Sequence, residues 1–306
     1  MIKFGEDCED LASVPTHLDV GGHTYAVLQQ LHKTQHTAVY LAHDSQSRVP
    51  QVVKMYWNSD FALRAGASYR LIQQFRHHFA GIMPDIIEQS ESYQISQFCS
   101  GPDLELYFQY PRAVNEIHHI ALDLADKIGV LLKLGLVHSD IKPANILLPF
   151  PWRGDHTATS IIDFDFLVRP GSRALRTGMN IFGTPYFAAP EQCAGDATLT
   201  TDVYSFGIML YVLLGERYNL PLIFGHIDMS VRNLLLLRSR PYYFSPQEFV
   251  SKIAQHIQSR SSPSPEEMKS ILVLLECIAY CTRYDPELRP ETGEQIRKIL
   301  LRSPSI

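Results

Sequence analysis

A short segment near the middle of the 306-residue chain carries side chains that could take part in phosphoryl transfer. Asp140 is followed by Lys142 two residues later and by Asn145 five residues later. A carboxylate can orient a hydroxyl and accept its proton, and an ammonium can neutralise charge on a transferred group. A carboxamide oxygen can help to hold a magnesium ion. The roles of the three residues depend on the larger motif to which they belong.

Further segments that could complete such a site follow in the chain. The sequence Ser160-Ile161-Ile162 predicts a strand that leads directly into Asp163-Phe164-Asp165. Gly183-Thr-Pro-Tyr186 then precedes Ala188-Ala-Pro-Glu191, and Arg289 follows much later in the chain. Each short segment is weak evidence alone, but their order along the chain is a specific signal.

Taken together, these segments resemble the catalytic machinery of Ser/Thr protein kinases. The resemblance implies that Asp140 is the catalytic base and that Lys142 balances charge on the phosphoryl group. It implies that Asn145 and Asp163 hold Mg²⁺. A lysine at position 142 is typical of members that phosphorylate Ser or Thr. The chance reading, a polar loop of no function, does not explain the later segments.

The same resemblance assigns structural roles to residues outside the transfer chemistry. Glu191 and Arg289 are expected to form a buried ion pair, and Asp202 is expected to anchor the catalytic loop. Phe164 is expected to pack between two lobes. Asp165 stands where the family has glycine, so a permissive backbone hinge is lost. Its carboxylate could either strengthen metal binding or repel the nucleotide phosphates.

In the N-terminal half, Lys54 matches the strand lysine that contacts the α- and β-phosphates of ATP and takes part in catalysis. Val52 narrows the adenine pocket, and Ser96 is expected to leave a back pocket open. The residues that the resemblance places around ATP are Val39, Val52, Lys54, Ser96, Gln97, Cys99, Asp103, Asn145, Leu147 and Asp163.

The loop that should cover the phosphates departs from the family pattern. His32, Thr34 and Thr37 occupy its three glycine positions. Glycine lets backbone N–H groups approach phosphates closely, so we expect a stiffer loop with looser phosphate contacts. Side-chain donors such as Lys33 or His36 could substitute, or the segment could be an ordinary turn between strands.

Two further positions depart from the pattern. Residues 61–84 contain no Asp or Glu. Ser68 or a neighbour stands where a helix glutamate should pair with the lysine, and Gln73 or Gln74 could be a polar substitute. Ser139 replaces the arginine that usually precedes the catalytic aspartate, which argues against activation through a phosphorylated segment. Thr177 and Thr184 nevertheless remain candidate phosphorylation sites.

Three functions are therefore open. The leading hypothesis is an active, atypical Ser/Thr kinase that uses ATP and Mg²⁺ and phosphorylates a hydroxyl of another protein or of its own chain. The second is a pseudokinase that acts as a scaffold or an allosteric partner. The third is a small-molecule kinase on a related fold. It is disfavoured because such enzymes generally lack the segment from Gly183 to Glu191 and its distant arginine.

The elements that must position these residues can also be predicted. Strands are expected within residues 21–58 and at 86–87 and 93–99, with a helix over about 61–75. A turn at 100–103 separates them from a helical region. This pattern predicts an α+β, bilobal kinase-like fold. We expect an extension over residues 1–20, a small lobe over 21–100 and a larger lobe over 101–306. The extension could be an added strand, a tether or a partner site.

In the helical region, apolar residues recur with helical periodicity from Ile117 to Leu132, and Gly135 is placed to end that helix. The continuously apolar stretch 203–214 predicts a helix that is buried on all sides. Ser245 and Ser264 are each followed by a proline and, three residues on, by a glutamate, which predicts two capped helix starts.

Composition narrows the partners and the setting. The net charge is −5, from 27 basic and 32 acidic residues, which does not favour nucleic-acid binding. No apolar run approaches the roughly 20 residues that span a bilayer, and the first residues do not resemble a secretory signal. Five scattered cysteines suggest a reducing setting, so we expect a cytoplasmic protein. The histidines lack metal-ligand spacing.

Overall fold

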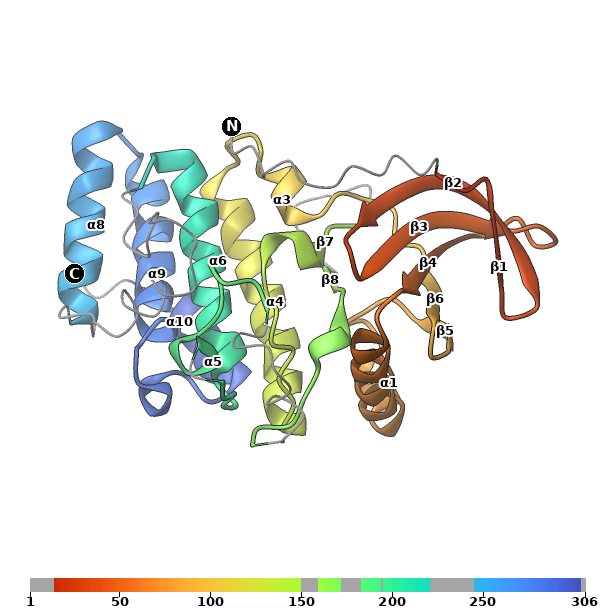
Figure 1. Cartoon of the computed structure of the whole chain (residues 1–306). Helices are drawn as coiled ribbons and strands as arrows, with labels where there is room; N and C mark the ends of the chain where they lie inside the picture. Colours follow the sequence, from red (N-terminus) through yellow and green to blue (C-terminus); the bar gives the residue numbers. More distant parts are fainter. Residues whose placement is uncertain (1–13, 150–158, 172–182, 194, 221–244, 304–306) are drawn as a thin grey trace. The chain divides into compact units, whose positions relative to one another are not determined.

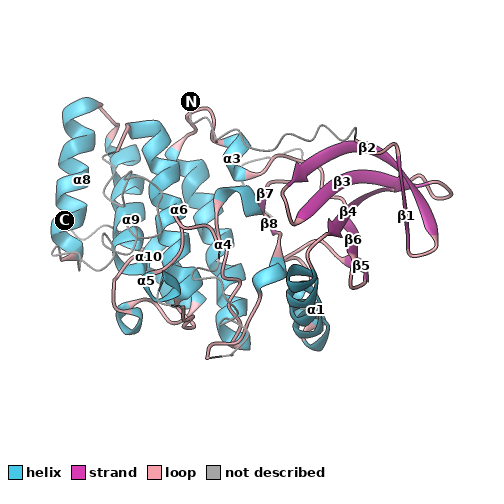
Figure 2. Ribbon diagram, viewed as in Figure 1, coloured by secondary structure: helices cyan, strands magenta, loops and turns pink. Residues whose placement is uncertain are grey.

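A computed structural model describes residues 14–149, 159–171, 183–193, 195–220 and 245–303 of the chain. The chain divides into two compact units. The first unit comprises Met1–Leu63 and Asp85–Phe98, and the second comprises Arg64–Pro84 and Cys99–Ile306. Figures 1 and 2 show the strand-rich and the helix-rich regions. Residue Thr177 lies outside the described residues.

The first unit is built on a six-stranded antiparallel sheet with the order β1-β2-β3-β4-β6-β5. Its strands are β1 (His17–Val20), β2 (His23–Lys33), β3 (Thr37–Asp44), β4 (Pro50–Tyr56), β5 (Ile86–Gln89) and β6 (Tyr93–Gln97). The strands predicted within 21–58 and near 86 and 93 are therefore confirmed. The edge strand β1 falls inside residues 1–20, so of the three possibilities for this extension the structure shows an added strand at its C-terminal end.

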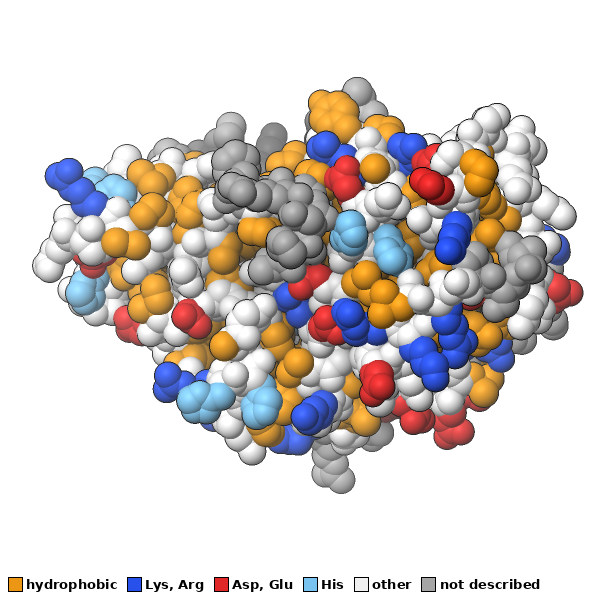
Figure 3. Space-filling model, turned by 180° about the vertical axis from the view of Figure 1, so that it is seen from behind, with side chains coloured by type: hydrophobic (Ala, Val, Ile, Leu, Met, Phe, Trp, Pro, Cys, Tyr) orange, Lys and Arg blue, Asp and Glu red, His pale blue; other side chains and the backbone are white. Residues whose placement is uncertain are grey.

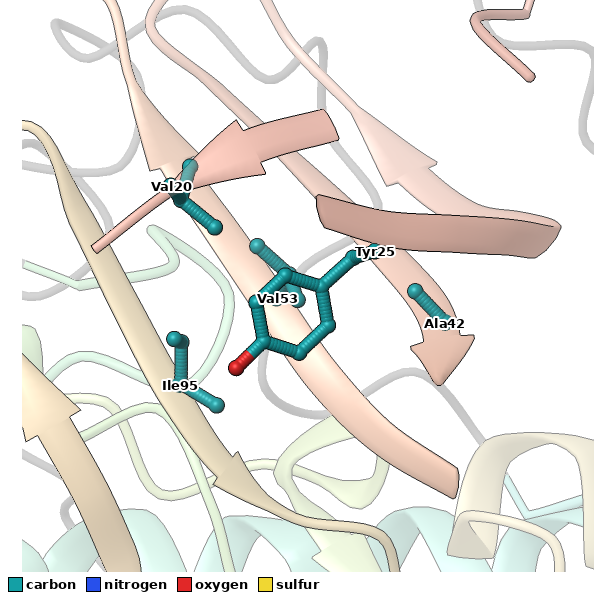
Figure 4. Close-up of a cluster of buried hydrophobic side chains, with 5 residues drawn as sticks. All are labelled: Val20, Tyr25, Ala42, Val53 and Ile95. Atoms are coloured by element: carbon teal, nitrogen blue, oxygen red, sulfur yellow. The ribbon is translucent and has the colours of Figure 1, made fainter. Parts of the chain in front are cut away.

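A small apolar cluster stabilises one face of this sheet. Figure 4 shows its members converging from β1, β2, β3, β4 and β6: Val20, Tyr25, Ala42, Val53 and Ile95. Burial raises the pKa of Tyr25, and the nearby carboxylates of Asp44 and Glu88 raise it further. Because side chains alternate between faces of a strand, residues next to Val53 and Ile95 in sequence point to the opposite face.

The second unit is mainly helical. The helix α1 begins in the first unit and continues into the second. The helices are α1 (Ser59–Gln74), α2 (Arg76–Phe79), α3 (Leu104–Tyr107), α4 (Val114–Leu134), α5 (Pro190–Cys193), α6 (Thr201–Tyr218), α8 (Pro246–Arg260), α9 (Pro265–Cys281) and α10 (Gly293–Leu300). A two-stranded ribbon joins β7 (Ile146–Leu147) and β8 (Ser160–Ile161). Short 3-10 helices span Pro143–Asn145, Phe164–Phe166 and Pro286–Leu288.

The helical core is the one that the apolar periodicity predicted. The helix α4 ends at Gly135, which has a left-handed φ of 68° and donates its N–H to the carbonyls of Leu131 and Leu132. The helix α6 packs against α4 and α9, and α8 and α10 pack on the same bundle (Figure 1). The residues of α6 are buried on nearly every side of the helix, as the apolar sequence of this segment indicated.

The two predicted helix caps differ in their outcome. At α8, Ser245 accepts from the N–H of Glu248, whose carboxylate accepts from the N–H of Ser245, which completes the expected box. At α9, Ser264 accepts from the N–H of Glu267. The Glu267 carboxylate instead accepts from Arg217 at 2.7 Å and from the Tyr218 hydroxyl at 2.8 Å. A guanidinium is a stronger partner than a backbone amide, so the second box stays half formed.

Acidic and basic side chains are interspersed on the face shown in Figure 3. None of the helices within the described ranges combines the length and the apolar character that a bilayer crossing requires.

Candidate active site

A buried aspartate at the start of α6 fixes the loop that carries the catalytic candidates. The carboxylate of Asp202 accepts from the backbone N–H of His138 at 2.6 Å and from that of Ser139 at 2.9 Å. Ser139 has a left-handed φ of 73°, so the loop needs this external support. Burial raises the pKa of Asp202. The predicted anchoring role of Asp202 is therefore confirmed by its hydrogen bonds.

His138 connects this loop to the strand that leads to Asp163. Its side chain is fully buried, and Nε2 lies 3.0 Å from the carbonyl oxygen of Ile162. The N–H of Asp140 lies 3.2 Å from Nδ1, which must accept this bond. Nε2 is therefore the nitrogen that donates to the Ile162 carbonyl. The ring acts as a rigid spacer between the two segments.

Asp140, Lys142 and Asn145 converge as the motif spacing suggested. Lys142 Nζ lies 2.8 Å from Asp140 Oδ2, and Asn145 Nδ2 donates to the same oxygen at 3.0 Å. Asn145 Nδ2 also donates to the Asp140 carbonyl at 2.8 Å. The N–H of Thr184 donates to Asp140 Oδ1 at 2.7 Å, and Lys142 Nζ donates to the Thr184 hydroxyl. The carboxylate is therefore held from three directions.

The hydrogen bonds leave defined oxygen atoms for further partners. A carboxylate offers about four lone-pair sites, and the three bonds to the Asp140 carboxylate leave roughly one, on Oδ1. Both bonds from the Asn145 side chain come from its nitrogen, so the carboxamide oxygen is the atom left to ligate a cation. Judged by the contacts of the described residues, the Asp140 carboxylate can accept one more hydrogen bond. The Asn145 carboxamide oxygen can bind one metal ion.

The ribbon of β7 and β8 brings Asn145 and Asp163 to the same end of the site. The N–H of Ile162 donates to the carbonyl of Asn145 at 2.9 Å, directly before Asp163. Asp163 has a left-handed φ of 65°, which an aspartate tolerates better than most residues. Asp165 lies inside the short 3-10 helix Phe164–Phe166, a conformation that any residue adopts. The glycine that the family has there is not needed for this backbone.

Phe164 is buried with 5% of its surface exposed. Its ring packs edge-on against His138, with centroids 4.5 Å apart, and against Phe79, with centroids 5.5 Å apart. Both partners belong to the second unit.

The helix position where a glutamate was expected makes a different contact. Ser68 is buried, and its Oγ lies 3.0 Å from the Asp165 carbonyl and 3.2 Å from the Leu167 carbonyl. Although residues 61–84 contain no Asp or Glu, Ser68 therefore connects this helix to the segment after Asp163.

The start of the segment from Gly183 to Glu191 packs against the catalytic loop. A Cβ atom on Gly183 would lie 2.3 Å from the Ser139 carbonyl, and the φ of Gly183 is 79°. Only glycine fits there. The Lys142 ammonium donates to the Thr184 hydroxyl, and a phosphate on Thr184 would be placed beside the Asp140 carboxylate. It would also adjoin the Lys142 ammonium, so phosphorylation of Thr184 stays a prediction.

The predicted ion pair between Glu191 and Arg289 is confirmed. Arg289 Nη1 lies 2.6 Å from Glu191 Oε1, and Nη2 lies 2.9 Å from Oε2, a bidentate geometry. The Arg289 side chain is fully buried. Burial raises the pKa of the Glu191 carboxyl, but the hydrogen bond and charge of Arg289 outweigh burial and lower the pKa overall.

Gln192 is a contact that the sequence analysis missed. Its Nε2 donates to the Ser139 carbonyl at 2.9 Å, and its Oε1 accepts from the N–H of Ala189 at 2.8 Å. Its position directly after Glu191 was the one available signal.

Four of the predicted nucleotide residues lie on one face of the first-unit sheet. Val39 is paired with Lys54, and Val52 is paired with Ser96, so each pair shares a face. Lys54 and Val52 are two residues apart on β4 and share that face too. It is the face opposite the cluster in Figure 4. The Lys54 ammonium lies 5.7 Å from the centre of the Tyr56 ring.

Four further nucleotide candidates lie between the end of β6 and the end of β7: Gln97, Cys99, Asp103 and Leu147. Gln97 ends β6, and its N–H donates to the Asp85 carbonyl at 2.9 Å. Asp103 and Leu147 are directly bridged in the second unit. Asp103 Oδ1 caps α3 by accepting from the N–H of Leu106 at 2.7 Å. Cys99 is half-buried.

The turn between β2 and β3 satisfies its own backbone. The N–H of Thr34 donates to the Thr37 carbonyl at 2.8 Å. The hydroxyl of Thr34 accepts from the N–H of His36 at 3.1 Å and from that of Thr37 at 3.0 Å. The His36 ring also stacks on Phe61, with centroids 4.6 Å apart. These amides, which glycines would offer to phosphates, are bound inside the turn.

Among the described residues, no group of three or more His, Cys, Asp or Glu side chains is arranged to hold a metal ion. An Asn–Asp pair supplies only part of an octahedral shell, so Mg²⁺ would need phosphate and water oxygens as further ligands.

Comparison with known proteins identifies the family of this chain. The Protein kinase domain family matches residues 25–298, so the chain belongs to the protein kinase family. Its fold resembles the crystal structure of the PF14_0431 kinase domain with a TM-score of 0.63 and 16% identity, covering 95% of this chain and 98% of that one. The chain thus has the bilobal α+β fold of protein kinases.

Among relatives, the dual serine/threonine and tyrosine protein kinase of Strongylocentrotus purpuratus is 39% identical over 135 residues, 42% of this chain and 13% of that protein. The receptor-like kinase TMK4 of Arabidopsis thaliana is 28% identical over 185 residues, 58% of this chain and 18% of that protein. The probable serine/threonine-protein kinase PknB of Lactococcus lactis is 27% identical over 129 residues, 41% of this chain and 20% of that protein. The chain therefore matches no more than a fifth of the length of these relatives.

Proposed function

We propose that the protein is a Ser/Thr protein kinase that transfers the γ-phosphoryl group of ATP to a protein hydroxyl. The observation that carries this proposal is the arrangement of Asp140. Its carboxylate is fixed by Lys142, Asn145 and Thr184, yet it keeps one acceptor site for the proton of an incoming hydroxyl. A scaffold would not need a carboxylate that is held in this way with an acceptor site left open.

In this mechanism Asp140 orients the acceptor hydroxyl and receives its proton as the bond from that oxygen to the γ-phosphorus forms. The bond from the γ-phosphorus to the bridging oxygen breaks, and ADP leaves with that electron pair. Lys142, anchored by both Asp140 and Thr184, is placed to balance charge on the transferred group. Lys54 would balance charge on the α- and β-phosphates.

The residues present fit a magnesium ion that arrives with the nucleotide. The carboxamide oxygen of Asn145 and the carboxylate of Asp163 are hard oxygen ligands at one end of the β7–β8 ribbon. When bound, Mg²⁺ supplies positive charge to the β- and γ-phosphates. Val39, Val52, Ser96, Gln97, Cys99, Asp103 and Leu147 would surround the remainder of ATP.

Two observations support the alternative, a pseudokinase scaffold. The amides of the β2–β3 turn are satisfied by Thr34, and residues 61–84, which include most of α1, contain no Asp or Glu. Both changes would weaken nucleotide binding without altering the fold.

The class of phosphoryl acceptor is suggested by the Gly183–Glu191 segment and its Arg289 partner. They favour a protein acceptor, including a second copy of the chain, over a small molecule. The cytoplasmic setting stays a prediction.

Phosphoryl transfer from labelled ATP to a generic protein and to the chain itself tests the proposal. Wild type should show Mg²⁺-dependent transfer, and Asp140→Asn and Lys54→Met should each lose most of it, because one removes the base and the other a phosphate contact. Thermal stabilisation by ATP that depends on Mg²⁺ and is lost in Asp163→Asn should accompany transfer. No transfer and no ATP-dependent shift at any Mg²⁺ concentration would establish the scaffold.

A further inference from the structure

The hydroxyl of Ser68 bonds helix α1 to residues 163–167, the segment that begins with the candidate metal ligand Asp163. Ser68 is 3% exposed, and its Oγ lies within hydrogen-bond distance of two backbone carbonyls, at 3.0 Å from Asp165 and 3.2 Å from Leu167. A hydroxyl has a single proton, so the two carbonyls share it. Both carbonyls belong to the turn that directly follows Asp163, and all these residues lie in the second unit.

This bonding pattern is not the usual one for a serine inside a helix. Such a serine commonly bonds a carbonyl of the preceding turn of its own helix. Ser205 in α6 does this: it is 1% exposed, and its Oγ lies 3.4 Å from the Thr201 carbonyl. Ser68 instead bonds carbonyls that lie 97 and 99 residues away in the chain. Its hydroxyl therefore joins two separate segments.

The segment that it holds needs support. Asp163 adopts a left-handed φ of 65°, which persists for a residue with a Cβ only where the surroundings enforce it. On its C-terminal side, Leu167 donates to the Phe164 carbonyl, and Val168 exchanges two backbone hydrogen bonds with Val137. Ser68 adds the contact between this turn and α1.

We propose that Ser68 is a positioning residue that fixes the backbone after Asp163, and with it the direction of the Asp163 carboxylate. It lies on α1 at or beside the position where the family resemblance places a glutamate, and it holds the helix to the turn after Asp163 by a neutral hydrogen bond. The backbone part of this inference is independent of catalysis. The metal part rests on the proposed function.

Hydrogen exchange and Mg²⁺ dependence together test the proposal. Four full-length proteins are compared: wild type, Ser68→Ala, Ser68→Thr and the matched control Ser205→Ala, which removes a buried hydroxyl bonded within its own helix. Exchange is followed without nucleotide at the amides of Leu167 and Val168. The Mg²⁺ concentration that gives half-maximal ATP binding is then measured for each protein.

Losing one neutral hydrogen bond should speed exchange at these two amides about 2- to 10-fold in Ser68→Ala. The required Mg²⁺ concentration should rise by a similar factor. Ser205→Ala should match wild type in both readouts, and Ser68→Thr, which keeps the hydroxyl, should move back toward wild type. If the threonine variant does not fold, the comparison of the two alanine variants decides.

Unchanged exchange at Leu167 and Val168 in Ser68→Ala would overturn the proposal, as would equal acceleration across the whole chain. Faster local exchange with an unaltered Mg²⁺ requirement would overturn the positioning of Asp163. If wild type binds no Mg–ATP but Ser68→Ala still shows local acceleration, the proposed function fails while the backbone tether stands.

Discussion

The carboxamide of Gln192 donates to the carbonyl oxygen of Ser139 at 2.9 Å and so joins the end of the segment 183–193 to the catalytic loop. Ser139 directly precedes Asp140 and has a left-handed backbone, and its side chain cannot supply the charge of the arginine usual at this position. A neutral amide bridge therefore holds the two segments together without a phosphate. This arrangement agrees with the absence of the arginine-based switch.

We expect Gln192→Ala to lower the free energy of unfolding by about 1–3 kcal/mol, because the buried Ser139 carbonyl would lose its donor. Phosphoryl transfer should fall as well, because the loop that orients Asp140 is loosened. Urea denaturation and initial rates measure the two effects. The exposed Gln258→Ala, on α8, is the control and should change neither. A wild-type rate in Gln192→Ala would show that the bridge is only structural.

The ion pair between Glu191 and Arg289 should be a major contributor to stability. Replacing Arg289 with methionine leaves a buried carboxylate without its partner, so we expect a loss of about 3–5 kcal/mol in urea denaturation. Arg297 provides the matched control, because it pairs with Asp126 at 2.7 Å with side chains 37% and 58% exposed. Arg297→Met should cost only about 0–1 kcal/mol. Similar losses in both variants would contradict the burial argument.

The same pair predicts a pH dependence. Because the folded pKa of Glu191 is lowered from its ordinary value of 4.5, the ionised carboxylate stabilises the fold above that pH. This contribution is lost as the pH falls through the folded pKa. The difference in unfolding free energy between wild type and Glu191→Gln should therefore be largest at neutral pH and shrink below the ordinary pKa. A difference that stays constant from neutral to acidic pH would refute the role of ionisation.

The turn between β2 and β3 should respond to removal of one hydroxyl. Thr34→Gly releases the amides of His36 and Thr37 from the threonine oxygen and restores a flexible backbone. We expect ATP to bind several-fold more tightly, as measured by calorimetry in the presence of Mg²⁺. Thr34→Ser keeps the hydroxyl and should bind as wild type does. Equal affinity in all three proteins would show that this turn does not contact the phosphates.

Ser96 should determine tolerance of enlarged adenine analogues. It lies opposite Val52 on the same face of the sheet as Lys54 and has a small side chain. We expect wild type to bind ATP analogues with bulky groups on the exocyclic amine, whereas Ser96→Phe should exclude them and still bind ATP. Competition binding measures both affinities. Equal rejection of the analogues by the two proteins would place Ser96 away from the adenine.

The sequence by itself determined the class of fold and the residues with chemical capacity. The spacing of Asp140, Lys142 and Asn145 put three partners within one loop, where local backbone geometry brings them together. The periodicity of α4 and the glycine that ends it were likewise local signals. The Glu191–Arg289 pair joins distant residues, but it was available because both belong to segments that the kinase resemblance recognises.

The tertiary structure decided which backbone groups the neutral polar side chains bind. The partners of Ser68 and the bridge from Gln192 to Ser139 were not readable in the sequence, and the sequence left open whether the first twenty residues add a strand, form a tether or bind a partner. A hydroxyl or carboxamide can bond any nearby amide or carbonyl, and every residue except proline offers both groups. Residue type therefore does not specify such a partner. It becomes defined only when folding brings segments from distant parts of the chain within hydrogen-bond distance.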